Sequence, residues 1–161
     1  MKEIKLTQNQ ISKVSDHKFH KLNKYNWKAL WSPYTKSFYA VRHEGKGIHR
    51  KMIHMHRQVA NTPNALVCDH INHDTLDNQD HNLRNVTQSQ NQMNRKSAQA
   101  NNKLRERGIS RHGAGFQVQV RVGGKHAYCK HFKTLEDAIT ARNIAIQKFH
   151  GEFAGETGEA R

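Results

Sequence analysis

Residues 67–95 have the sequence VCDHINHDTLDNQDHNLRNVTQSQNQMNR, which decides how the chain is interpreted. Short apolar runs at residues 66–68 and 83–86 predict two strands, and a polar loop rich in Asn and Asp joins them. Thr87 then suits the N-cap of a helix, and Gln90 completes a capping-box pattern three residues later. We therefore expect strand, loop, strand and helix in this order, with the helix continuing to about residue 100.

The polar residues of this stretch suit the hydrolysis of a phosphodiester. That reaction deprotonates a water molecule and neutralises new negative charge, which a histidine beside an oxygen-ligated divalent metal can do. Asp69 is a hard oxygen ligand directly before His70, and Asn91 on the expected helix can present a second oxygen. Asn82 can accept a hydrogen bond from the His70 ring, which would fix its tautomer and aim its other nitrogen at water.

The remaining polar residues of the loop have a simpler interpretation. Asn and Asp favour turn conformations, so we expect Asp77 and Asn78 to make turns. Asn72 and Asp74 allow the same interpretation, and His73 either contacts DNA or has no role.

The Asp69-His70 pair, Asn82-Leu83-Arg84 and Asn91 also occur in an order typical of one enzyme family. The segment resembles the HNH nucleases of the ββα-metal fold, specifically the homing type found in phages and introns. This resemblance implies His70 as the general base and Asp69 and Asn91 as ligands of one Mg²⁺ or Mn²⁺ per active site. It also implies Asn82 as the residue that orients His70. The last histidine of the family's motif is an asparagine here, a variation known in this branch.

Residues 1–62 predict a small α+β unit that resembles the domain preceding the nuclease in many phage HNH proteins. Two helices are expected, at residues 16–22, with Asp16 as the N-cap, and at residues 55–60. His56 and Arg57 could reach the scissile phosphate, or they could pack a helix and present a solvated basic face. Strands are expected at residues 4–6, 27–31, 38–41 and 48–53.

Residues 108–154 predict a three-stranded antiparallel sheet packed on one helix. Apolar and polar residues alternate over residues 116–122, which is the period of a half-buried strand. Gly123-Gly124 predicts a tight hairpin. The helix is expected between Thr134 as N-cap and Gly151 as C-cap.

This C-terminal module resembles the plant ethylene-response-factor (APETALA-type) DNA-binding domain, which docks its sheet in the major groove. The resemblance implies a DNA-reading face opposite the apolar stripe, although a solvated polar face is the alternative. Tyr128 stands where family members often carry tryptophan, so base specificity does not transfer. The residues expected on this face are Arg111, Gln117, Gln119, Arg121, His126, Tyr128 and Lys130.

Charge and composition predict the partner. Lys and Arg number 27 against 13 Asp and Glu, giving a net charge of +14, which favours double-stranded DNA. No apolar run is long enough to span a bilayer, and residues 1–10 are too polar for a signal peptide. We therefore expect the cytoplasm, that of a bacterial host if a phage encodes the chain. Cys68 and Cys129 form no CxxC pair, which disfavours a cysteine-based zinc site.

The sequence thus predicts an α+β protein that acts as a site-recognising DNA endonuclease of phage or mobile-element origin. A catalytically inactive DNA-binding regulator is the main alternative. An RNA-binding protein would explain the charge but not the set of Asp69, His70, Asn82 and Asn91. The expected segments are an α+β unit at 1–62, the nuclease at 63–100, a basic linker at 101–107, the second DNA-binding module at 108–154 and a tail at 155–161.

Overall fold

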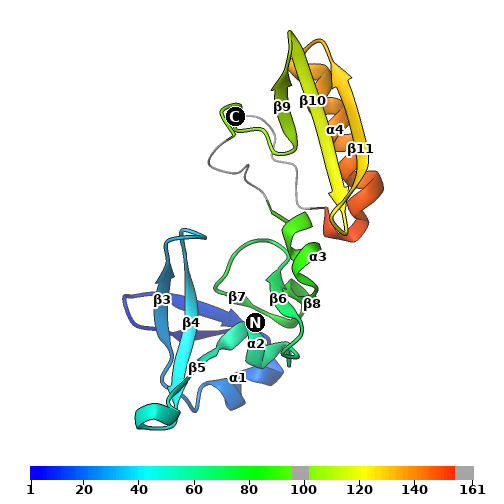
Figure 1. Ribbon diagram of the computed structural model, residues 1–161. Coiled ribbons are helices and arrows are strands. Elements are labelled where there is room, and N and C mark those ends of the chain that lie inside the picture. Colours follow the sequence, from blue (N-terminus) through cyan, green and yellow to red (C-terminus); the bar gives the residue numbers. More distant parts are fainter. Residues whose placement is uncertain (96–101, 155–161) are drawn as a thin grey trace. The chain divides into compact units, whose positions relative to one another are not determined.

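A computed structural model describes residues 1–95 and 102–154 (Figure 1). The chain divides into two compact units, Met1–Thr87 and Gln88–Arg161, each of which is described by itself. The expected tail at 155–161 and the expected continuation of a helix to residue 100 lie outside the described residues.

The first unit begins with a hairpin that the sequence analysis found only in part. β1 (Lys2–Lys5) pairs antiparallel with β2 (Ile11–Val14). β2 pairs on its other side, in parallel, with β7 (Asp77–Asn78). This short parallel pairing fixes part of the predicted polar loop against the start of the chain.

A second sheet of the first unit is an antiparallel meander. β3 (Lys28–Ser32), β4 (Ser37–Glu44) and β5 (Lys51–His54) lie in this order. The predicted strand at 48–53 is wrong at its start, because Gly47–His49 forms the 3-10 turn η1.

Two short helices flank these sheets. α1 (Asp16–Leu22) has the predicted bounds, but its N-cap is Ser15 and not Asp16. α2 (Met55–Val59) confirms the predicted helix after the meander. One apolar core, which contains Val14, Leu22, Trp27, Met55 and Leu83, joins these elements.

A two-stranded sheet completes the first unit. β6 (Val67–His70) pairs antiparallel with β8 (Leu83–Val86), and the 3-10 turn η2 (Asp80–Asn82) leads into β8. The first predicted strand ended at Cys68, whereas β6 also includes Asp69 and His70. Asp69, the proposed metal ligand, and His70, the proposed general base, therefore both belong to a strand.

The second unit starts with α3 (Gln88–Met93), which is shorter than predicted. The Arg107 guanidinium donates to the carbonyl oxygens of Gln92 and Met93 at 3.0 and 2.9 Å, and also to that of Arg95. These are carbonyl groups that a helix leaves without partners where it ends. Because α3 and β6–β8 belong to different units, a complete ββα-metal core stays a prediction.

The rest of the second unit is the predicted sheet on a helix (Figure 1). β10 (Gly115–Val122) is central, between β9 (Ile109–His112) and β11 (Lys125–Phe132), and all pairings are antiparallel. The hairpin at Gly123-Gly124 is confirmed, with φ of 56° and 79°, the positive values that a type I′ turn requires.

α4 (Leu135–His150) packs on this sheet and has the predicted caps. Thr134 Oγ1 accepts a hydrogen bond from the backbone N–H of Asp137 at 3.1 Å, and Gly151 ends the helix. Ala138 and Ala145 are buried and allow the close approach of helix and sheet. The 3-10 turn η3 (Gly151–Phe153) follows. Among the described residues, no helix combines the length and apolarity needed to cross a bilayer.

Candidate functional site

His70 ends strand β6 and is 6% exposed. Its Nε2 lies 3.2 Å from Oδ1 of Asn78, which belongs to β7 and is fully buried. Burial lowers the pKa of His70, although the Asn78 hydrogen bond and the nearby Asp69, Asp74 and Asp77 act in the opposite direction. The ring is therefore neutral at pH 7 and can accept a proton.

The contacts of Asn78 determine which nitrogen of His70 carries the proton. The Asn78 amide nitrogen donates to Ser12 Oγ at 2.8 Å and to the Leu76 carbonyl at 3.4 Å. Its oxygen is therefore the acceptor that faces His70. This arrangement favours the tautomer in which Nε2–H donates to Asn78 and Nδ1 is unprotonated.

Ser12, from a strand near the start of the chain, holds the Asn78 side chain in place. Its side chain is fully buried on β2, and its hydroxyl donates to the Leu76 carbonyl at 3.0 Å. The parallel pairing of β2 with β7 brings Ser12 beside Asn78, although 66 positions separate them. Ser12, Asn78 and His70 thus form one buried chain of hydrogen bonds.

Asp69 precedes His70 on β6 and pairs with Arg84 of β8. Arg84 Nε and Nη2 lie 2.9 and 2.8 Å from the same carboxylate oxygen, Oδ2. The antiparallel register places the two residues opposite each other. This ion pair fixes the orientation of a carboxylate that is only 7% exposed.

Asn82 does not make the hydrogen bond that the sequence analysis assigned to it. Its oxygen accepts from the backbone N–H of Asn72 at 3.0 Å, and its nitrogen donates to the Asp77 carbonyl at 2.8 Å. Asn82 therefore ties the two sides of the loop together, and Asn78 takes the position beside the His70 ring.

The expectation that Asp77 and Asn78 only make turns is also wrong. Both are buried and form β7. Asp77 accepts from the side chains of Asn72 at 3.0 Å and Gln79 at 2.8 Å. No local pattern in the sequence indicates this role, because it depends on pairing with the distant strand β2.

Two further histidines and a tyrosine gather beside the His70 ring. The His56 ring centroid lies 5.2 Å from those of both His54 and His70, and Tyr39 lies 5.6 Å from His56. Burial, followed by the neighbouring His70, lowers the pKa of His56 to about 3. His56 is 9% exposed and packs against His70, which favours the packing alternative for this residue.

Arg57 is held by backbone carbonyl groups. Its Nη1 donates to Leu66 at 3.1 Å, and its Nη2 donates to Pro63 at 3.1 Å and to Thr62 at 3.5 Å. These bonds fix the connection between α2 and β6. The structure therefore favours the packing alternative for Arg57 over a phosphate contact.

The expected metal site has chemically suitable donors. No cluster of three or more His, Cys, Asp and Glu side chains with metal-binding geometry exists among residues 1–95 and 102–154. Mg²⁺, however, is commonly held by one or two carboxylates and completed by water and phosphate oxygens. One carboxylate at Asp69 and one amide oxygen fit that pattern. Asn91 lies half-buried on α3 of the second unit, and its pairing with Asp69 stays a prediction.

One face of the sheet in the second unit is polar, but the residues on it differ in part from those expected. Residues opposite each other in antiparallel strands share a face. Phe116, Val118 and Val120 of β10 pack toward α4. Their partners on the neighbouring strands are Arg111, Lys130 and Tyr128, which therefore lie on the α4 side of the sheet. Gln117, Gln119, Arg121 and His126 are on the polar face, as expected.

The error has a structural cause. The register of β11 shifts between Val120 and Arg121, where Ala127 is an extra residue. A bulge of this kind reverses the alternation of side chains along the strand. His126 before the bulge and His131 after it therefore share the polar face, while Tyr128 and Lys130 do not.

The polar face is a connected set of side chains. The His112 and His131 ring centroids are 4.4 Å apart, and Gln117 Nε2 lies 3.1 Å from His131 Nε2. Gln119 donates to Gln117 at 2.6 Å, and Arg121 Nη2 lies 3.1 Å from His126 Nε2. The sequence analysis missed His112 and His131.

The amino-acid sequence has a recognisable relative. It is 30% identical over 142 residues to an uncharacterized HNH endonuclease of Acanthamoeba polyphaga mimivirus, covering 88% of this chain and 71% of that protein. No known family profile and no solved structure matches the chain. The alignment includes most of both units. This chain belongs to the HNH endonuclease family.

Proposed function

We propose that the chain is a DNA endonuclease that hydrolyses phosphodiester bonds in double-stranded DNA, with His70 as general base. The observation that carries the proposal is the buried chain from Ser12 through Asn78 to His70, next to the Asp69 carboxylate. Such a chain holds a neutral imidazole in one tautomer, which is what a general base needs. The mimivirus relative, which is named as an endonuclease, supports the same reaction class.

The proton transfer follows from the hydrogen-bond directions. Nδ1 of His70 takes a proton from water, and the resulting hydroxide attacks phosphorus as the leaving oxygen departs. Nε2–H continues to donate to Asn78 Oδ1 in the imidazolium, so the existing hydrogen bond stabilises the charged ring. Asp69 adds a negative charge beside it.

Asp69 and Asn91 are the residues proposed to hold one Mg²⁺ or Mn²⁺. A hard divalent cation there would neutralise charge that develops on the phosphate and the leaving oxygen. The Arg84 contacts orient the Asp69 carboxylate for this role. Asn82 contributes indirectly, since it fixes the loop that bears Asn78.

The second unit is proposed to recognise DNA through the polar face of its sheet. Gln, His and Arg side chains there can donate to and accept from base edges in the major groove. The net charge of +14 supports a polyanionic partner. With such a module the enzyme would be site-recognising, as in homing endonucleases of phages and other mobile elements.

Cleavage of supercoiled plasmid tests the reaction. Wild-type protein with Mg²⁺ is expected to convert plasmid to nicked or linear products, and EDTA is expected to stop this. His70→Ala should abolish cleavage while duplex binding persists, and His49→Ala, which removes an exposed histidine of the same unit, should cut normally. Binding without metal-dependent cleavage would instead identify an inactive DNA-binding regulator.

A further inference from the structure

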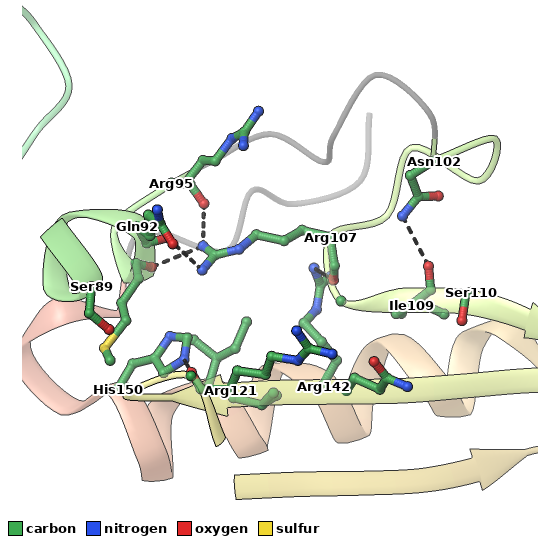
Figure 2. A pocket seen from close by; sticks show the side chains of 16 residues that line it. Ser89, Gln92, Arg95, Asn102, Arg107, Ile109, Ser110, Arg121, Arg142 and His150 are labelled. Atoms are coloured by element: carbon green, nitrogen blue, oxygen red, sulfur yellow. Dashed lines mark hydrogen bonds between the residues drawn. The ribbon is translucent and has the colours of Figure 1, made fainter. Parts of the chain in front are cut away.

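The second unit contains a cavity of about 560 Å³ that has no part in the chemistry above. It lies between the C-terminal end of α3, the segment that precedes β9, and the adjoining parts of β10 and α4 (Figure 2). Cavities of roughly 300 to 1,000 Å³ accommodate small organic ligands. The space is therefore sufficient for a nucleotide-sized group.

Positive charge dominates the wall of this cavity. Four arginines contribute to it, and none of its described lining residues is Asp or Glu. The arginines are Arg95, Arg107, Arg121 and Arg142. Neutral donors complete the wall at Ser89, Gln92, Asn102, Ser110 and Gln119.

Only one of the four arginines is matched by a carboxylate within the described parts of the chain. Arg142 Nη2 lies 3.0 Å from Glu106 Oε2, while its Nη1 donates to the Arg107 carbonyl at 3.1 Å. Arg107 donates to backbone carbonyl oxygens, and Arg121 Nη2 lies 3.1 Å from Nε2 of His126. The Arg95 side chain contacts no described carboxylate.

The arginines also crowd one another. Burial and the charges of Arg142 and Arg95 lower the pKa of Arg107. Guanidinium groups stay protonated in proteins, so a bound anion would relieve this crowding where deprotonation does not. The planar donors of arginine match the oxygens of phosphate particularly well.

We propose that this cavity binds a phosphate group, supplied by the nucleic-acid backbone, through Arg95 and Arg121. Arg107 and Arg142 are held by their own hydrogen bonds and provide the fixed positive wall. Gln119 and Arg121 belong both to the cavity and to the polar sheet face. A phosphate in the cavity would thus fix the register of DNA on that face, because phosphate contacts position a protein on a duplex.

Binding of the anion is tested on the full chain without metal. Inorganic phosphate is titrated into ¹⁵N-labelled protein, with NaCl at equal ionic strength as reference, and the arginine Nε–H signals are followed by NMR. Wild type is expected to show saturable shifts, and Arg95→Gln with Arg121→Gln should abolish them. Arg105→Gln removes an exposed arginine outside the cavity and should change nothing. A response that never saturates, or one that survives in the double variant, would overturn the site.

A second measurement identifies the source of the phosphate, which is the part that rests on the proposed function. Anisotropy of a labelled duplex is measured over a range of salt concentrations. Each lost phosphate contact should reduce the log–log salt slope by about 0.9, and inorganic phosphate should compete with the duplex. If the double variant keeps the wild-type slope while a 5′-mononucleotide still saturates wild type, the cavity serves free nucleotides and the DNA assignment is wrong. Plasmid cleavage by wild type is scored separately, so failure of the nuclease proposal would be seen independently.

Discussion

Nε2 of His70 and Oδ1 of Asn78 lie 3.2 Å apart, and the second residue is completely shielded from solvent. The remaining hydrogens of the Asn78 amide are directed to Ser12 and Leu76. This leaves the amide oxygen one role, which is to accept from the histidine. The protonation pattern of the proposed base is therefore set by strand β2, near the start of the chain.

Removing the Asn78 side chain should impair catalysis through His70. Mutation of a residue that orients a functional side chain usually lowers activity roughly 10- to 100-fold. Asn78→Ala is therefore expected to lower kcat by about that factor, and Ser12→Ala by less, because Leu76 still contacts the amide. Asn64→Ala, in an exposed loop, is the matched control.

The tautomer of His70 distinguishes a positioning role of Asn78 from a purely structural one. The ¹⁵N shifts of the His70 ring distinguish the Nε2–H tautomer from the Nδ1–H tautomer, and they do so without any turnover. In folded Asn78→Ala the ring should become a mixture of the two. If the tautomer and the rate both stay at their wild-type values, Asn78 does not position His70.

Asp69→Asn should lower the affinity of the enzyme for its metal. The amide keeps the shape and one oxygen of the carboxylate but loses the charge that attracts a divalent cation. The Mg²⁺ concentration for half-maximal cleavage should rise by at least roughly tenfold. Asp16→Asn alters an exposed carboxylate of the same unit and should leave the Mg²⁺ titration unchanged. An identical titration for Asp69→Asn would remove Asp69 from the metal site.

His56 should make the first unit sensitive to acid. Its pKa falls from 6.5 to about 3 on folding, so the unfolded chain binds its proton first as the pH falls. The contribution of His56 to stability is therefore complete above about pH 6.5 and is lost progressively toward pH 3. One proton corresponds to about 1.4 kcal/mol per pH unit in this window.

Tryptophan fluorescence can measure this effect, because both tryptophans, Trp27 and Trp31, lie in the first unit. Urea unfolding at several pH values between 7 and 4 gives the free energy of unfolding. In His56→Gln the free energy of unfolding should fall less steeply as the pH is lowered. His49→Gln, at an exposed position, should behave like wild type. Equal slopes for His56→Gln and wild type would show that His56 is not the buried neutral group.

The amino-acid sequence predicts those parts of the protein that depend on local patterns. The start of β6 at Val67-Cys68 and the strand at Leu83-Arg84 follow from short apolar runs, and α4 follows from Thr134 and Gly151 at its ends. Asn78 could not be found in this way. Its role requires β7 to pair with β2, a contact between distant segments that no local signal specifies.

The polar sheet face of the second unit shows a second limit of prediction from sequence. Alternation correctly places Gln117 and Gln119, because β10 is regular beside β9. It fails for Tyr128 and Lys130, since one extra residue at Ala127 reverses the pattern along β11. Bulges leave little trace in an alternating sequence, and here the consequence is a different set of predicted DNA contacts.

The corrected face gives a sharp test of recognition. Gln117 and His131 share the polar face, whereas Arg111 and Lys130 lie on the side of α4. If the polar face reads bases, Gln117→Ala and His131→Ala should each relax the preference at one or two base pairs. A good bidentate contact to a base is worth about 1 to 3 kcal/mol of discrimination.

Selection of bound duplexes from a randomised library measures this preference directly. Arg111→Gln and Lys130→Gln remove positive charge from the other side, so they should lower affinity for all sequences alike and leave the selected motif unchanged. The opposite result, in which the motif changes only with these two variants, would place the DNA on the side of α4. A motif that none of the four variants alters would assign recognition to the first unit, and the sheet would then serve only to hold the duplex.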